Sequence, residues 1–297
     1  MRIKFWGVRG SIPSPGRKGF STAKYGGNTP CVELRMQDNT ILVIDAGSGL
    51  RLMGNELAGL DFEGKKKINS TEFGTGKGEI NVLFSHYHWD HIQGLPFFKP
   101  LYIKGNKINF FGSNTEQKLL AQMKTPFFPI DFNFTGATKT YREIRDGDKI
   151  KIGNCTVSIT ELNHPDRVFG FRMEEGKSVF TYASDVENNV SNREKLLEFA
   201  RNSDVLVYDC QYTFMEYDPR YHGKEGEGKK DWGHSIIQEG VRIAAEAGVK
   251  TMVSFHHNPE SSDRKIDDIL KFARRFKKEY GKELEIIGAY EGLEIEI

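Results

Sequence analysis

The run H-Y-H-W-D-H at residues 86–91 constrains this chain more than any other feature of its 297 residues. It directly follows an apolar stretch that predicts a β-strand. In extended backbone, His86 and His88 are two residues apart and point to the same side. Asp90 and His91 come where the chain turns, so they can face a second point nearby. The run therefore predicts two adjacent functional sites at one strand end.

Divalent metal ions fit this arrangement. Two ions about 3.5–4 Å apart need ligands that diverge slightly from one anchor. Imidazole and carboxylate suit zinc, iron or manganese, and the lack of cysteine in the run argues against a closed structural zinc site. A His-rich surface loop is the alternative, but clustered histidines without partners are costly. We expect two divalent ions per chain, zinc first, with manganese or iron as alternatives.

Further candidate ligands stand at other predicted strand ends. His164 follows one apolar run, Asp185 follows the next, and His256 and His257 end a later one. A rigid sheet commonly presents functional side chains on the loops that follow its strands. The position directly after the strand favours His256 over His257 as a ligand, and leaves His257 as the alternative.

The pattern along the chain indicates an α/β protein. Val-, Ile-, Phe- and Thr-rich runs predict strands at residues 2–7, 31–36, 40–45, 81–85, 107–112, 155–161, 168–173, 178–183, 204–209 and 250–255. Helical patterns lie at residues 49–60, 114–124, 235–247 and 263–280. S-I-I-Q at Ser235 predicts a capping box, and residues 61–79 predict a surface excursion. With no linker in view, we expect sheets covered by helices in one domain, residues 1–297.

The composition excludes several classes. The formal net charge of +1 gives no global basic field for nucleic acid. Three scattered cysteines, Cys31, Cys155 and Cys210, fit a reducing compartment and small buried residues better than disulfides. The N-terminus lacks the uninterrupted apolar stretch of a signal peptide, and no segment approaches the ~20 apolar residues of a membrane span. We therefore expect a cytoplasmic protein without membrane partners.

The order and spacing of H-Y-H-W-D-H, His164, Asp185 and His256 resemble the five-motif signature of metallo-β-lactamase-fold hydrolases. The resemblance covers nearly the whole chain. It implies a four-layer αβ/βα sandwich and a division of the ligands between two metals. One metal would be held by His86, His88 and His164, the other by Asp90, His91 and His256, with Asp185 bridging.

A narrower resemblance points to the ribonuclease Z-like phosphodiesterases. It rests on I-D-A-G-S-G at residues 44–49, D-C-Q-Y at 209–212 and G-H-S at 233–235. Ribonuclease Z has a Glu where Asp209 stands, within His-Glu-Ala-Thr, whereas its Gly-His-Ser matches directly. The resemblance implies that Asp209 orients His234, which would act as general acid. A predicted helix start just after His234 also favours a bound phosphate; alternatively, His234 merely precedes a cap.

The chain also departs from ribonuclease Z. We see no Gly- and basic-rich arm for tRNA between Asp185 and Asp209, and the Gly- and Lys-rich segment 221–231 is short. P-F-F at residues 96–98 and P-F-F-P at 126–129 suggest an apolar wall beside the H-Y-H-W-D-H loop, more typical of core than of a substrate platform. In the N-terminal loop, Arg9 or Asn28 could touch an anionic substrate, although loop structure explains them equally well.

These features predict a metal-dependent phosphodiesterase that uses a metal-bridging hydroxide on a nucleotide-type or other small phosphodiester. Its catalytic residues would be Asp90, His234 and Asp209, with His234 also binding substrate. Nucleic acid stays open as a substrate, but not tRNA held by an exosite arm, and a homodimer is compatible with the sequence. Two alternatives remain: an ester, thioester or lactone hydrolase on the same fold, and a metal-dependent nucleotide-binding or sensing module.

Overall fold

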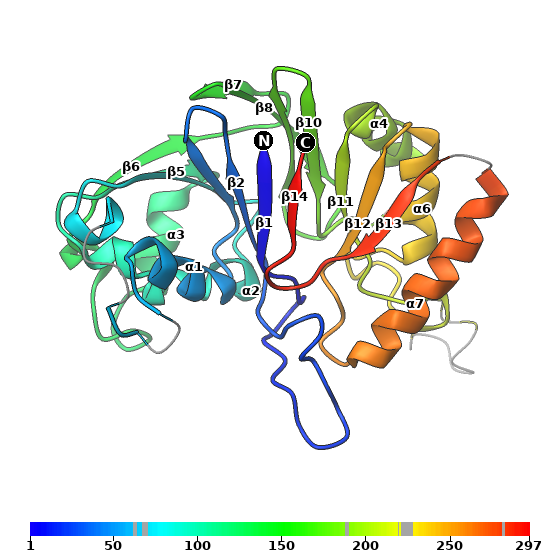
Figure 1. Cartoon of the computed structure of the whole chain (residues 1–297), viewed down its shortest axis with the longest axis horizontal. Helices are drawn as coiled ribbons and strands as arrows, with labels where there is room; N and C mark the ends of the chain where they lie inside the picture. The colour runs from blue at the N-terminus through cyan, green and yellow to red at the C-terminus, as the bar shows by residue number, and fades with distance from the viewer. Residues whose placement is uncertain (62–63, 67–70, 188–189, 219, 221–227, 281–282) are drawn as a thin grey trace.

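Two seven-stranded sheets lie face to face, with helices on their outer sides (Figure 1). The computed structural model describes residues 1–61, 64–66, 71–187, 190–218, 220, 228–280 and 283–297. The chain passes from one sheet to the other between β6 and β7, and returns at its C-terminus to place β14 beside β1. This arrangement confirms the expected α/β four-layer sandwich. No helix within the described residues is long and apolar enough to cross a membrane.

The first sheet mixes antiparallel and parallel pairs. Its spatial order is β14 (Glu294–Glu296), β1 (Arg2–Gly7), β2 (Cys31–Arg35), β3 (Ile41–Ile44), β4 (Glu79–Leu83), β5 (Lys107–Gly112) and β6 (Thr138–Glu143). Strands β3 to β6 run parallel. Their carboxyl ends therefore share one edge of the sheet.

The second sheet has the same plan. Its spatial order is β13 (Glu285–Gly288), β12 (Thr251–Phe255), β11 (Val205–Asp209), β10 (Ser178–Ala183), β9 (Val168–Glu175), β8 (Cys155–Leu162) and β7 (Lys149–Ile152). Strands β10 to β13 are parallel. A backbone hydrogen bond of 2.9 Å from Phe169 N to Ser85 O joins the carboxyl end of β4 to the second sheet. The two sets of strand ends thus meet at one edge of the sandwich.

Three apolar layers hold the sandwich together. The middle layer lies between the sheets and includes Phe5, Leu83, Phe171 and Phe255, all fully buried. Burial of this kind is worth about 1.5–3 kcal/mol per large apolar side chain. The outer layers pack the sheets against helices. The first sheet is covered by α1 (Gly49–Leu57), α2 (Trp89–Ile92) and α3 (Thr115–Gln122), and the second by α4 (Val190–Ala200), α6 (Ile237–Glu246) and α7 (Asp263–Phe276).

All ten predicted strands are present, with ends shifted by at most two residues. The strands that the sequence did not reveal are β6, β7, β13 and β14, which are short or have charged residues on an exposed face. Residues 263–280 continue past α7 as the 3-10 turn Lys277–Tyr280. The three cysteines are buried and free, as expected.

One local prediction is wrong. The capping box at Ser235 is absent, because α6 has Ile236 as N-cap and the Ser235 hydroxyl contacts the Tyr208 hydroxyl at 3.2 Å. In the predicted surface excursion 61–79, residues 62–63 and 67–70 lie outside the described residues. Its 3-10 turn Phe73–Thr75 places Phe73, 4% exposed, in the outer apolar layer. A single aromatic therefore anchors part of this stretch.

The N-terminal loop is held by structural contacts. The guanidinium of Arg9 is buried and donates to the carbonyls of Gly26 (2.8 Å), Asn258 (3.2 Å) and Ser261 (2.5 Å). Asn28 donates from Nδ2 to Glu291 and accepts from the hydroxyl of Ser48, both at 2.9 Å. These contacts favour loop structure over substrate binding for both residues.

We expect Arg9→Ala to lower the free energy of unfolding by about 3 kcal/mol or more, since each buried carbonyl left without a donor costs about 1–3 kcal/mol. Urea unfolding followed by circular dichroism measures this loss. Arg51→Ala is the matched control: Arg51 is exposed on α1, so its loss should stay within about 0.5 kcal/mol. Equal stabilities of the two variants would contradict a structural role for Arg9.

Candidate metal centre and catalytic residues

The candidate ligands gather where the carboxyl ends of the two sheets meet. His86, Asp90 and His91 follow β4, whereas Asp185 and His256 follow β10 and β12. Asp185 (φ 55°) and His256 (φ 57°) adopt left-handed backbone conformations. Such conformations are unfavourable for residues other than glycine and persist where the surroundings over-determine them, often at functional sites.

The first ligand group contains His86, His88 and His164, with one ring nitrogen of each within 4.8 Å of the others. Burial lowers the pKa of His86 well below its usual value, so its imidazole is neutral, the form that binds metal. Its Nε2 is buried and has no hydrogen-bond partner among the described residues. An unsatisfied buried nitrogen is costly, and a metal ion between these rings would satisfy it. These three histidines therefore fit the divalent metal ion that the fold implies.

The second group contains Asp90, His91 and His256, whose ligand atoms also lie within 4.8 Å of one another. The Nε2 atom of His256 is 3.1 Å from Asp90 Oδ2 and 3.3 Å from Asp185 Oδ1. The other oxygen of Asp185 is 3.3 Å from His91 Nε2, and Asp185 Oδ1 is 3.9 Å from His86 Nε2. Asp185 therefore lies between the two groups, the position a bridging ligand needs.

Asp45 orients one of these histidines, a role that the sequence did not reveal. It is fully buried after β3, and its Oδ2 accepts a 2.8 Å hydrogen bond from Nδ1 of His91. Ser85 and Tyr182 donate to the same carboxylate. Because Nδ1 is engaged, His91 presents Nε2 to the site, as is typical of carboxylate–histidine–metal arrangements. The available signal was an Asp directly after a buried strand, at the start of the D-A-G-S-G run.

Asp166 provides a second orienting carboxylate. Its Oδ2 lies 2.7 Å from His88 Nε2, and its backbone N–H donates to His164 Nδ1 at 3.2 Å. Asp166 thereby connects two members of the first ligand group. Its side chain is 72% exposed, so this contact lies at the surface of the site.

His257 has a structural position instead. Its Nε2 donates to the Ala289 carbonyl at 2.9 Å, and its ring lies edge-on to Tyr25. Burial lowers its pKa to about 3.

A Cβ at Gly10 would lie 2.5 Å from the ring of His256, so glycine is required where the N-terminal loop crosses that ring. The geometry therefore favours His256 as the ligand.

His234 and Asp209 form a pair beside the ligand groups. The distance between His234 Nδ1 and Asp209 Oδ2 is 2.8 Å, and Asp185 Oδ1 is 3.9 Å from the same nitrogen. Burial lowers the pKa of His234, but the carboxylates of Asp209, Asp185 and Asp90 outweigh burial and raise it to about 9. Since α6 begins at Ile237, His234 lies farther from a helix N-terminus than expected.

A buried carboxylate holds the His234 loop in place. Glu187, 5% exposed, accepts hydrogen bonds from the backbone N–H groups of Asp231 (2.8 Å) and Gly233 (3.0 Å). Its backbone N–H donates to the Asn163 carbonyl at 2.9 Å. Glu187 thus ties together the loops that carry Asp185, His164 and His234. Sequence reasoning missed it, because nothing local marks an acidic residue as buried.

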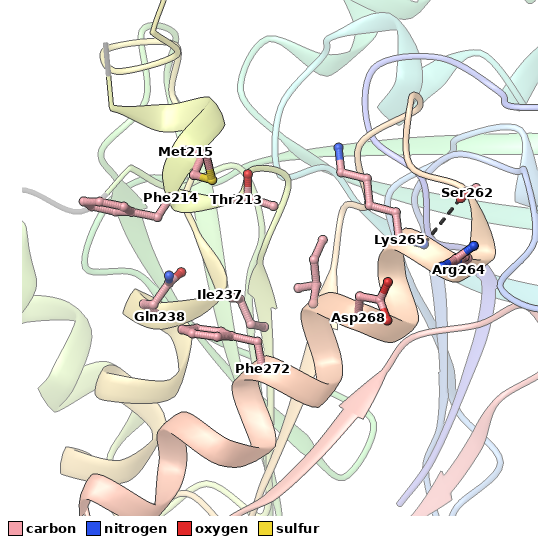
Figure 2. Close-up of a pocket in the computed structure, with 11 residues that line it drawn as sticks. Thr213, Phe214, Met215, Ile237, Gln238, Ser262, Arg264, Lys265, Asp268 and Phe272 are labelled. Atoms are coloured by element: carbon pink, nitrogen blue, oxygen red, sulfur yellow. Dashed lines mark hydrogen bonds between the residues drawn. The ribbon is translucent and has the colours of Figure 1, made fainter. Parts of the chain in front are cut away.

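A separate hollow of about 590 Å³ lies between α5 (Phe214–Tyr217), α6 and α7 (Figure 2). Phe214, Ile237, Lys265 and Phe272 contribute to its walls. None of its lining residues belongs to the candidate metal groups. The hollow is therefore separate from the strand ends that carry the candidate ligands.

We expect Asp45→Asn to weaken metal binding about 10- to 100-fold, because an amide cannot replace both acceptor oxygens around His91. Competition with a chromophoric chelator measures the metal affinity directly. Asp268→Asn, on the exposed face of α7, is the matched control and should leave the affinity unchanged. An unchanged affinity in Asp45→Asn would remove the orienting role.

Comparison with known proteins identifies the family. Residues 59–257 match the model of the β-lactamase superfamily domain. Ribonuclease Z of Thermoplasma acidophilum is 23% identical over 94% of this chain and 93% of its own length. The human short-form tRNase Z is 18% identical, and the match covers 100% of this chain and 99% of that one. A diphosphatase of the PhnP family is 16% identical, and the match covers 100% of this chain and 97% of that one. Each superposes with a TM-score of 0.65. The chain therefore belongs to the metallo-β-lactamase superfamily, as a hydrolase related to ribonuclease Z.

Proposed function

We propose that this protein is a binuclear metal-dependent phosphodiesterase acting on nucleotide-type phosphodiesters. The main supporting observation is the contact of His234 with the fully buried Asp209, 2.8 Å apart and directly beside Asp185. Ester, thioester and lactone hydrolysis needs no such pair. Its relatives named ribonuclease Z, which share about a fifth of its residues, support a phosphodiester substrate.

In this proposal, His86, His88 and His164 hold one divalent ion and Asp90, His91 and His256 hold the other, with Asp185 shared. Ions bound there would supply an activated water and neutralise negative charge on the phosphate oxygens. Zinc is the expected metal for such nitrogen and oxygen donors, with manganese and iron as alternatives. The protein contributes the fixed geometry, because Asp45 and Asp166 orient histidines in both groups.

His234 donates a proton to the departing alkoxide. Asp209 engages Nδ1 of the ring, so the proton transferred to substrate is the one on Nε2. Asp209 is itself fully buried and accepts the backbone N–H of Gln211 at 2.9 Å, which fixes its orientation. General-acid catalysis of this kind contributes typically 10²–10⁴-fold.

The charge of the site favours diesters over monoesters. Asp45, Asp90, Asp185 and Asp209 place four carboxylates within the buried cluster. A phosphodiester carries one negative charge, whereas a phosphomonoester carries nearly two at neutral pH. Two divalent ions would compensate these four carboxylates, and the raised pKa of His234 leaves one further positive charge, which matches the single charge of a diester.

The described structure does not favour tRNA as the substrate. Between β10 and β11, the described residues contain α4 but no projecting arm. Of the Gly- and Lys-rich segment 221–231, residues 221–227 lie outside the described residues. A smaller nucleotide-type diester is consistent with this absence.

We expect protein containing about two ions per chain to hydrolyse bis(4-nitrophenyl) phosphate, with 4-nitrophenyl phosphate at least tenfold slower. Elemental analysis and parallel assays with lactone and thioester panels test this directly. Removal of the metal with a chelator should abolish turnover, and added zinc or manganese should restore it. Turnover of lactones or thioesters alone would support the ester-hydrolase alternative. Nucleotide binding without any turnover would support the sensing module.

We expect His234→Ala to lower kcat about 10²–10⁴-fold on a diester with a basic alkoxide leaving group. The loss should shrink for a nitrophenolate, which departs without a proton. Asp209→Asn should show the same dependence more mildly. Metal content should stay unchanged in His234→Ala, since this residue is not a proposed ligand. An equal loss on both substrates would mean that His234 only binds phosphate.

A further inference from the structure

Two of the three tryptophans are exposed next to the proposed catalytic residues. Trp6 is 9% exposed, and its indole N–H donates to Glu33 in the sheet. Trp89 is 81% exposed and Trp232 is 57% exposed. Large aromatic side chains usually bury most of their surface. Two exposed indoles beside one site therefore call for a physical explanation.

Trp89 lies between two candidate ligands. It is the first residue of α2, after His88 and before Asp90. Asp90 is 5% exposed and points inward, where its carboxylate accepts the backbone N–H of Ser11 at 2.7 Å. The inward placement of Asp90 fixes the backbone of the turn and leaves the indole of Trp89 in solvent. The exposed ring of Trp89 thus belongs to the same turn as His88, the exposed member of the first ligand group.

Trp232 is presented by a loop whose backbone is held on both sides. The two N–H groups that donate to Glu187 belong to Asp231 and Gly233, the neighbours of Trp232. Both neighbours have positive φ, 67° and 86°. For Asp231, this conformation is strained, and such strain persists only where contacts over-determine the backbone. The loop therefore holds an exposed aromatic in a fixed position.

Contacts between site residues bring the loops of the two tryptophans together at the first ligand group. The rings of His88, next to Trp89, and His164 lie 5.1 Å apart. A Cβ at Gly233 would lie 2.3 Å from the His164 ring, so the Trp232 loop packs directly against that histidine. The loops that carry Trp89 and Trp232 are thus linked through His88, which is exposed, and His164, which is half-buried.

The charge beside Trp232 favours a nucleotide over an apolar partner. The ammonium of Lys229 lies 3.7 Å from the centre of the indole ring. A cation over one face of the ring attracts a phosphate, and a flat heterocycle would stack on the opposite face. Base stacking on an aromatic side chain is sequence-tolerant and is worth roughly 5- to 100-fold in affinity per base.

The predicted apolar wall, residues 96–98 and 126–129, contains both buried and exposed phenylalanines. Phe98 is fully buried in the core beneath the first sheet, whereas Phe97 and Phe127 are 58% and 81% exposed. Phe97 lies edge-on to Phe128, at 5.8 Å. Neither exposed ring is adjacent in sequence to a candidate ligand, so we assign base binding to the tryptophans.

We propose that Trp89 and Trp232 are stacking platforms for the two nucleobases that flank the scissile phosphate. The inference rests on the proposed phosphodiesterase function. Trp232 is two residues from His234, so it would bind the base on the leaving-group side, and Trp89 would bind the base on the retained side. The preferred substrate class is then a linear diester between two nucleosides.

The test uses a dinucleoside monophosphate and two analogues, each lacking one base. Trp232→Leu should lower kcat/KM roughly 5- to 100-fold on the full substrate. The loss should be severalfold smaller on the analogue without the leaving-side base. Trp89→Leu should show the opposite dependence, and Trp232→Phe should recover most of the loss. Phe272→Leu, an aromatic that is 45% exposed on α7, is the matched control and should behave like the unaltered protein.

A second readout does not depend on turnover. Thymidine 5′-monophosphate should quench the tryptophan fluorescence of the metal-loaded protein, whereas deoxyribose 5-phosphate should not. Quenching with no diester hydrolysis would support the platforms while refuting the proposed function. Hydrolysis with equal rates for full and base-lacking substrates would refute the platforms and leave the function standing. A change only in oligomeric state, measured by light scattering of the Leu variants, would assign the tryptophans to a protein interface and also refute the proposal.

Discussion

The rest of the site depends on the close contacts between buried carboxylates and imidazoles where the two sheets meet. Asp45, Asp90, Asp185 and Asp209 are each at most 5% exposed. Isolated carboxylates at this depth would be very costly. Each instead faces at least one histidine within 4 Å, and these contacts hold the pKa values of Asp90 and Asp185 below the usual range even though burial opposes this.

The same carboxylates explain why the two sheets pack against each other in one alignment. Tyr182, from the second sheet, donates to Asp45 on the first at 2.9 Å, and His256 contacts Asp90 across the same gap. A shift of either sheet would leave buried charges without partners. The apolar layer between the sheets supplies the general attraction, whereas the charged cluster specifies one alignment.

One buried side chain, Glu187, holds both the loop of the proposed proton donor and the loop of Trp232. Glu187 connects the loops of Asp185, His164 and His234, and it holds the backbone on both sides of Trp232. The proposed proton donor His234 and the proposed platform Trp232 are therefore positioned by the same buried carboxylate, close to the proposed bridging ligand. A site built this way is preorganised, which is what electrostatic catalysis and specific stacking both require.

Sequence alone determined the α/β class, the core strands and the candidate ligand set, because these depend on local periodicity and on chemically distinctive residues at strand ends. The roles of Asp45, Asp166 and Glu187 required the tertiary structure, since a carboxylate orients a histidine only through contacts between distant segments. The same holds for Arg9 and His257, whose backbone carbonyl partners carry no residue-type signal. Edge strands such as β14 also escaped prediction, because pairing with β1 stabilises a three-residue strand that has little propensity of its own.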